Sequence, residues 1–180
     1  MAKEFNRNKY KGLFETDGAV DVFLEQRKDK LEDWKYMFKE WIYKNKEDGW
    51  KDLADRVFSV YIRLKNADKD GRCKCITCGK VLHWREIQNW HYRSRGCNKY
   101  RFSEKNCHPQ CYGCNVKKNW NYRNYHKYMV ERYGEEVEEK LWNDKESVKY
   151  KQGWYENHIR LWWKYIKWVL YWGKTKKRDG

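Results

Sequence analysis

The stretch "CITCGK" (residues 75–80) is followed some thirty residues later by "HPQCYGCN" (residues 108–115), and each stretch contains a CxxC pair. Two such pairs can close a tetrahedron of thiolates around Zn²⁺, because each CxxC turn directs two sulfurs at one ion. We therefore predict a structural zinc site formed by Cys75, Cys78, Cys111 and Cys114. The alternative is that these thiols are free or redox-active.

Three further cysteines, Cys73, Cys97 and Cys107, bring the total to seven. An odd number argues against a disulfide framework, which belongs to secreted proteins. Cys73 is a further candidate ligand, although the CxC spacing with Cys75 presents the two thiols on opposite sides of an extended chain. Four thiolates leave zinc no open position for a substrate, so the predicted site is a scaffold.

The N-terminus has no apolar run of the signal-peptide type, and no segment approaches the roughly 18 apolar residues of a membrane span. We therefore expect a cytoplasmic protein that does not enter a membrane.

The net charge of +15 is concentrated on the cysteine-containing segment. Residues 1–60 carry 13 basic and 13 acidic side chains, whereas residues 61–128 carry 16 Lys and Arg against four acidic residues, a net charge of +12. A cluster of one sign favours a polyanion, because binding releases its counterions. Nucleic acid is the expected partner, and an incidental basic face is the alternative.

Apolar residues at helical spacing flank the cysteine-containing segment on both sides. They predict helices over residues 31–42, 53–64, 122–133, an acidic helix after Gly134, and a Trp-rich helix over residues 154–172. The segments "VLHW" (81–84) and "IQNWHYR" (87–93) predict short strands. The sequence therefore predicts an α+β protein that is predominantly helical. We expect the Trp-rich helix to pack on the N-terminal helices, with a protein partner or an oligomer interface as the alternative.

Three polar residues stand beside the predicted zinc site: His91 in a predicted strand, Asn106 before the second CxxC, and Asn115 directly after Cys114. An imidazole can take a proton from water, and an amide can hold its orientation. The Asn115 oxygen can bind a hard cation such as Mg²⁺. These residues can therefore surround one phosphate, but a histidine in an aromatic strand is also a common packed or surface residue.

Residues 75–134 resemble a known protein family. They contain a CxxCGK knuckle, a His followed by an aromatic residue and SR, then RF, ExN, HPQC and CxxCN, in that order. This string is similar to the NinG family of phage recombination proteins, also called Rap, which contain an HNH or His-Me finger nuclease core. The resemblance continues weakly to about residue 150.

The resemblance implies a zinc-stabilised ββα-metal fold. Its nuclease core would occupy residues 71–134, between an N-terminal helical region (1–70) and a C-terminal helical region with a basic tail (135–180). It implies a structure-specific DNA endonuclease that cuts branched recombination intermediates such as Holliday junctions, in the bacterial host cytoplasm if the protein is phage-encoded. The products would carry a 5′ phosphate and a 3′ hydroxyl.

The same resemblance implies roles for the three polar residues. His91 would be the general base, Asn106 would orient the loop or His91, and Asn115 would hold a catalytic Mg²⁺ or Mn²⁺. Trp90 stands where many HNH nucleases place a metal ligand, and Trp120 stands where a small glycine is expected. Either His91 itself completes the metal shell, or one of four other residues does so: Asn89, Glu104, His108 or Asn121.

Basic side chains near these positions are candidates for phosphate contacts, with a solvated basic face as the alternative. They are Arg93, Arg95, Arg101, Lys117 and Lys118. Three tyrosines are candidates for stacking on unpaired bases or, alternatively, for core packing. They are Tyr92, Tyr100 and Tyr122. Two alternative functions stay open: a non-catalytic zinc-containing nucleic-acid-binding module, and a module that recruits a protein partner through its Trp-rich helices. A homodimer would suit paired cuts across a junction.

Overall fold

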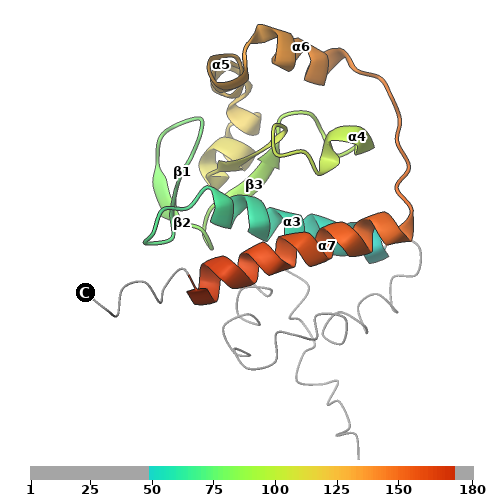
Figure 1. Cartoon of the computed structure of the whole chain (residues 1–180). Coiled ribbons are helices and arrows are strands. Elements are labelled where there is room, and N and C mark those ends of the chain that lie inside the picture. Colours follow the sequence, from blue (N-terminus) through green and yellow to red (C-terminus); the bar gives the residue numbers. More distant parts are fainter. Residues whose placement is uncertain (1–48, 173–180) are drawn as a thin grey trace, which may run out of the picture. The chain divides into compact units, whose positions relative to one another are not determined.

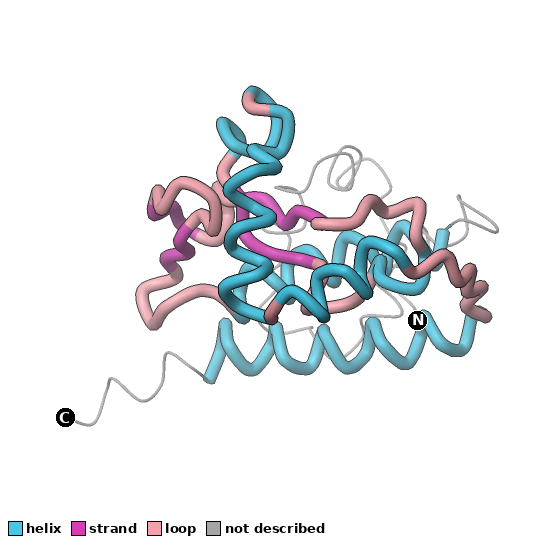
Figure 2. The backbone as a smooth tube through the Cα atoms, turned by 90° about the horizontal axis from the view of Figure 1, so that it is seen from above, coloured by secondary structure: helices cyan, strands magenta, loops and turns pink. Residues whose placement is uncertain are grey.

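The computed structural model describes residues 49–172 of the chain. The helix predicted over residues 31–42 lies outside the described residues. Residues 50–172 belong to one compact unit. Figure 1 shows its helices and strands along the chain, and Figure 2 shows the same backbone seen from above.

The described residues are mostly helical and contain two small sheets, as the sequence predicts for an α+β protein. In chain order the elements are α3 (Gly49–Lys65), β1 (Arg72–Lys74), β2 (Val81–His83), β3 (Gln88–His91), α4 (Asn98–Arg101), β4 (Cys107–Gln110), the π-helical turn η2 (Gly113–Lys117), the 3-10 turn η3 (Asn119–Asn121), α5 (Tyr122–Tyr133), α6 (Glu135–Asn143), α7 (Gln152–Lys167) and the π-helical turn η4 (Trp168–Trp172).

The first sheet is the antiparallel hairpin of β1 and β2, in which Lys74 pairs with Val81. The six residues between these strands are the first cysteine stretch, 75–80. Its turn is closed by a hydrogen bond from the Gly79 N–H to the Cys75 carbonyl, at 2.9 Å. Gly79 has φ +76°, a conformation that costs glycine little. The hairpin therefore places both cysteines of the first pair on one tight turn.

The second sheet pairs β3 with β4, from Gln88 opposite Gln110 to His91 opposite Cys107. All four residues of β4 are buried. The carbonyl of Pro109 in β4 accepts a hydrogen bond from the Ile76 N–H at 3.1 Å, which ties the first cysteine turn to this sheet. Cys111 follows β4 directly, so the sheet delivers the second cysteine pair to the first.

Helices α5 and α6 form a small core with the end of the second sheet. Tyr125 and Met129 lie one turn apart on α5 and are buried together with Tyr92 and Leu141. Gly134, at φ +85°, ends α5 and allows α6 to begin in a new direction. The predicted break and acidic helix are thereby confirmed.

Helices α3 and α7 run side by side (Figures 1 and 2). The Phe58 ring of α3 lies 4.8 Å from the Trp162 ring of α7, and Tyr61 contacts Tyr165 at 5.1 Å. Phe102, which directly follows α4, packs against both Phe58 and Trp162. The predicted packing of the Trp-rich helix on N-terminal helices is confirmed for α3. Within residues 49–172, none of the helices has the length and apolar character needed to cross a membrane.

Candidate functional site

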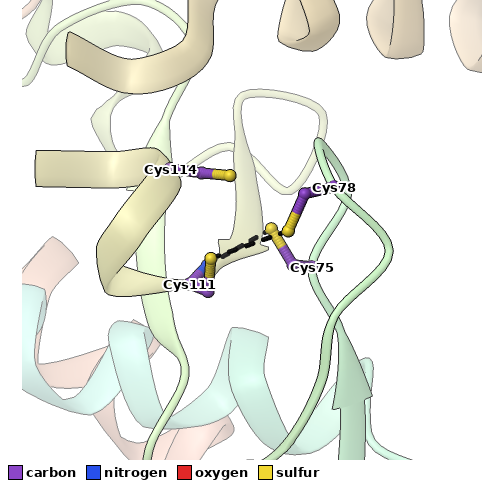
Figure 3. Close-up of side chains that lie close together, drawn as sticks. All are labelled: Cys75, Cys78, Cys111 and Cys114. Carbon is purple, nitrogen blue, oxygen red and sulfur yellow. Dashed lines mark hydrogen bonds between the residues drawn. The ribbon is translucent and has the colours of Figure 1, made fainter. Parts of the chain in front are cut away.

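The four predicted zinc ligands meet at one point. Their sulfur atoms all lie within 4.8 Å of one another. The Cys78 and Cys111 sulfurs are 3.7 Å apart, close to the roughly 3.8 Å that follows from Zn–S bonds of about 2.3 Å in a tetrahedron. Figure 3 shows the four side chains converging from the β1–β2 turn and from the start of η2. The geometry and the soft donor set both fit zinc.

Hydrogen bonds already favour one thiolate in this group. Burial raises the pKa of Cys75, but hydrogen bonds from the Thr77 side chain and from the Cys111 N–H outweigh it and lower that pKa to about 6. Burial and the neighbouring thiols raise the pKa of Cys78 to about 12. Sulfurs this close resist ionising together, so a bound dication is what stabilises the full set of thiolates.

The other three cysteines lie outside this group. The Cys73 thiol is buried and donates a hydrogen bond to the Arg63 carbonyl at 3.0 Å, and burial raises its pKa to about 11. Cys73 is therefore not a ligand here. Among the His, Cys, Asp and Glu side chains of the described residues, the four-cysteine group is the only set of three or more that is close enough to hold a metal.

His91 lies at the end of β3. Its Nε2 is 2.8 Å from the Arg101 carbonyl, which can only accept, so Nε2 carries the proton and Nδ1 is the basic nitrogen. Burial lowers the pKa of His91 to about 4, against the opposing effect of that hydrogen bond. Arg101 is itself fixed by a two-contact ion pair with Asp55. His91 is therefore a neutral, oriented imidazole at physiological pH.

A pocket of about 170 Å³ opens beside His91. Its wall contains one arginine, one serine and three aromatic side chains besides the imidazole. The lining residues are Trp90, His91, Tyr92, Ser94, Arg95 and Trp120. The Trp90 and Trp120 ring centroids are 6.1 Å apart with their planes inclined at 42°, so the two indoles form a wedge.

The backbone beneath Trp120 is strained. Asn119, Trp120 and Asn121 have φ values of 43°, 70° and 51°, three consecutive residues in the left-handed region. This conformation costs an L-residue about 1–2 kcal/mol, and asparagine and aspartate tolerate it better than a bulky side chain such as tryptophan. The expectation of a glycine at position 120 thus matches the backbone observed there. Trp120 is nevertheless 42% exposed, so packing covers only part of its ring.

Asn106 is fully buried and holds the loop between β3 and β4. Its Oδ1 accepts the Arg93 N–H at 2.7 Å, and its Nδ2 donates to the carbonyls of Arg93 and Tyr100, each at 3.0 Å. Because Tyr100 directly precedes Arg101, whose carbonyl bonds His91, Asn106 orients the segment that orients His91. Its contacts are those of a positioning residue.

Asn115 follows Cys114 and contacts β3. Its Nδ2 donates to Gln88 Oε1 at 2.6 Å, while its buried Oδ1 has no hydrogen-bond partner among the described residues. Gln88 lies three residues before His91, about 10 Å along the strand and on its opposite face. The structure therefore brings Asn115 to β3, but in the described residues Asn115 and His91 share no hydrogen-bond partner, and Asn115 does not line the pocket beside His91.

The other suggested ligands have different partners. Glu104 accepts hydrogen bonds from Tyr61 and Lys65 of α3. His108 is buried, and its two ring nitrogens are 2.9 Å from the hydroxyls of Tyr125 and Tyr133. Burial lowers the pKa of His108 to about 3. His108 is therefore a neutral core residue.

The buried His108 predicts a loss of stability in acid. Between its unfolded pKa of about 6.5 and its folded pKa of about 3, only the unfolded chain binds the proton. This difference in proton binding does not affect the free energy of unfolding above pH 6.5. Below that pH it lowers the free energy of unfolding by about 1.4 kcal/mol per pH unit as the pH drops toward 3. Urea denaturation across this range should show a smaller loss for His108→Gln. An equal loss in both proteins would contradict the assignment.

The predicted phosphate-binding residues divide into two groups. Arg93 donates from Nη1 to the carbonyls of Leu141 and Trp142, at the end of α6, and Arg101 is paired with Asp55. These two arginines therefore hold the fold. Arg95, Lys117 and Lys118 are exposed. Of the predicted stacking tyrosines, Tyr92 is only 4% exposed and belongs to the core, whereas Tyr122 is exposed.

Sequence patterning missed two parts of this site. The wedge formed by Trp90 and Trp120 joins residues thirty positions apart, and the pairing of Arg101 with Asp55 joins two helices. The only available signals were the two tryptophans at unusual positions in the motif string.

These features define a small α+β protein built around a four-cysteine knuckle that can hold a metal ion, with an aromatic pocket that contains Arg95 beside a neutral histidine. Residues 19–168 match the family described as "Bacteriophage Lambda NinG protein". This match covers most of the chain, which therefore belongs to the NinG family.

Individual relatives agree with this assignment. The chain is 30% identical to "Protein ninG" of Escherichia phage lambda over 93 residues, which are 51% of this chain and 43% of that protein. It is 33% identical to "Protein ninG" of Salmonella phage P22 over 86 residues, 47% of this chain and 40% of that protein. The matched region thus spans about two fifths of these relatives. No solved structure is significantly similar to the chain.

Proposed function

We propose that the protein is a DNA endonuclease of the HNH, or His-Me finger, type that cuts branched recombination intermediates such as Holliday junctions. The observation that carries this proposal is His91: a neutral imidazole, fixed through Nε2, in the wall of a pocket that also contains Arg95. A base of this kind can take a proton from an attacking water. The order of β3, β4 and the following helical turns supports a ββα arrangement.

Three residues of this chain then have roles in phosphodiester hydrolysis: His91, Arg95 and Asn106. His91 Nδ1 accepts the proton of the attacking water, since Nε2 is already committed to the Arg101 carbonyl. Arg95 contributes positive charge at the phosphate. Asn106 holds the loop that carries the Arg101 carbonyl, so it maintains the orientation of His91.

The residue that would hold a divalent cation in this proposal is Asn115, which bonds β3 at Gln88 and not at His91. Its buried, unpartnered Oδ1 is a hard oxygen donor of the kind that Mg²⁺ or Mn²⁺ binds. When bound, such an ion stabilises the charge on the phosphate and on the leaving oxygen. Because no cluster of acidic ligands accompanies Asn115 in the described residues, waters and substrate oxygens would supply most of the remaining ligands.

A second function is favoured by one observation. Trp90 cannot bind a metal, and it occupies the position next to His91 where a nuclease ligand is expected. A zinc-containing module that binds nucleic acid without cutting it is consistent with that residue. We further propose that a protein partner binds the exposed Trp168 and that two chains pair on a junction. The cleavage products and the mass of the protein in solution would test these proposals.

The two functions separate in a cleavage experiment. Labelled four-way junction should be cut by the protein with Mg²⁺ or Mn²⁺, and the products should carry a 5′ phosphate and a 3′ hydroxyl. Binding of the junction without any product under these conditions would support the non-catalytic module instead.

The affinity for DNA should fall as the salt concentration rises, in part because of the exposed lysines at the C-terminal end of η2. Each phosphate contact contributes about −0.9 to the slope of log K against log salt concentration. Replacing both Lys117 and Lys118 by alanine should therefore reduce the slope by about 2. The matched control is the pair Lys145 and Lys149, which is also exposed but lies in an acidic segment. A slope unchanged by the first pair would place the DNA elsewhere.

A further inference from the structure

We propose that Trp90 and Trp120 bind one unpaired nucleobase next to His91, so that the phosphate of the same nucleotide meets Arg95. This inference rests on the proposed DNA-binding function and specifies which part of a branched DNA the site engages. Its starting observation is that both tryptophans, His91 and Arg95 line a single pocket.

The size of the pocket fits one ring system. Its volume is about 170 Å³, and a cavity of about 150 Å³ accommodates a molecule of benzene. One pyrimidine base therefore fits, whereas a base pair does not. The two indoles stand 6.1 Å apart, and a ring inserted between them needs about 3.5 Å on each side. Insertion therefore needs an opening of roughly 1 Å together with a rotation of the exposed Trp120 that brings the two planes, inclined at 42°, closer to parallel.

The backbone argues that Trp120 is not there for packing alone. A side chain whose purpose is burial would be covered, but this indole is 42% exposed. It also sits at φ +70°, where glycine would be unstrained. Two hydrogen bonds hold this conformation: from Gln110 Nε2 to the Trp120 carbonyl at 2.6 Å, and from Asn121 Nδ2 to the Cys114 sulfur at 3.5 Å. The four-cysteine group thus helps to fix an exposed aromatic ring in a strained position.

The surrounding charge favours a nucleotide over an uncharged aromatic ligand. Arg95 is exposed at the pocket, within a segment that carries a net charge of +12 between residues 61 and 128. Stacking on an aromatic side chain tolerates any base, because every base has a π face. In a duplex, stacking on the neighbouring base pairs hides that face. The pocket therefore selects DNA that presents an unpaired base, as a branched DNA with a single-stranded flap does.

The test is binding of fluorescein-labelled duplexes with a short single-stranded flap, measured without added divalent metal so that cleavage does not interfere. One flap carries thymines and the other has the same backbone without bases. The full-length protein should bind the thymine flap roughly tenfold more tightly than the abasic flap. Trp120→Gly should lose this preference, and Trp120→Phe should retain most of it.

Trp120→Gly is suited to the measurement because glycine adopts the observed backbone without strain, which offsets the packing lost against Trp90. Its zinc content and melting temperature should stay near those of the wild type. Trp168→Ala removes another exposed tryptophan, one outside the pocket, and should keep the preference.

Three results would overturn the inference. The wild type could show no preference for the thymine flap over the abasic flap, Trp120→Gly could keep the full preference, or Trp120→Gly could lose affinity for both flaps equally. The proposed catalysis fails separately, if His91→Ala cleaves as fast as the wild type while the thymine preference persists.

Discussion

Replacing Cys111 by serine is expected to abolish zinc binding and unfold the region that connects the two cysteine turns. Cys111 joins β4 to η2, and its sulfur lies 3.7 Å from that of Cys78. A serine hydroxyl is a hard, protonated group and does not replace a thiolate. Structural zinc contributes an apparent binding free energy of about 10–16 kcal/mol, comparable with the total stability of a domain. The effect should therefore exceed that of an ordinary core substitution.

The measurement combines metal content with thermal unfolding. Wild-type protein should contain one zinc ion per chain, and Cys111→Ser should contain none and lose its cooperative transition. Cys97→Ser is the matched control, because Cys97 is a half-buried free thiol outside the four-cysteine group. A Cys111→Ser protein that retains zinc and melts like the wild type would refute the metal site.

His91→Ala is expected to slow DNA cleavage by about 10²–10⁴-fold while leaving DNA affinity nearly unchanged. The imidazole is fixed through Nε2 and is the group assigned to proton transfer, whereas phosphate binding is assigned to Arg95, Lys117 and Lys118. Single-turnover rates on a labelled junction measure the chemical step apart from binding. The matched control is His158→Ala, since His158 also bonds a backbone carbonyl, that of Trp154 at 2.8 Å, but lies on α7.

The pH profile gives this prediction a second readout. Because burial lowers the pKa of His91 to about 4, the base stays unprotonated down to that pH. The acidic limb of the cleavage rate should therefore lie near pH 4 and not near the usual histidine value of about 6.5. Equal rates in His91→Ala and wild type would remove the residue from the mechanism.

The strongest sequence signals predicted the corresponding parts of the structure. The two CxxC pairs converge as their spacing indicates, because ligand geometry is a local property of each turn. The helical spacing of Leu53, Val57 and Val60 gave a buried face of α3, and the aromatic stripe with Ile159 and Trp162 gave one of α7. In each case a long amphipathic period reports burial directly.

The two predicted short strands, 81–84 and 87–93, are confirmed as β2 and β3, but the other short elements and the side-chain pairings were not predictable in this way. Strand β4 is buried on both faces and contains Pro109, so it shows neither alternation nor an ordinary strand composition. Helix α4 spans four residues, too few to display a period. Composition also does not distinguish Arg95, which is exposed, from Arg93, which bonds the end of α6, because that difference depends on where α6 docks.

The most direct test of the central claim is the cleavage of four-way junction, flap and linear duplex by wild type and by His91→Ala, with Mg²⁺ or Mn²⁺ and without added divalent metal. We predict that the wild type cuts the branched DNAs only when the metal is added, prefers them to linear duplex, and loses this activity in His91→Ala. Binding of all three DNAs with no cutting of any would contradict the nuclease assignment and leave a zinc-stabilised DNA-binding module.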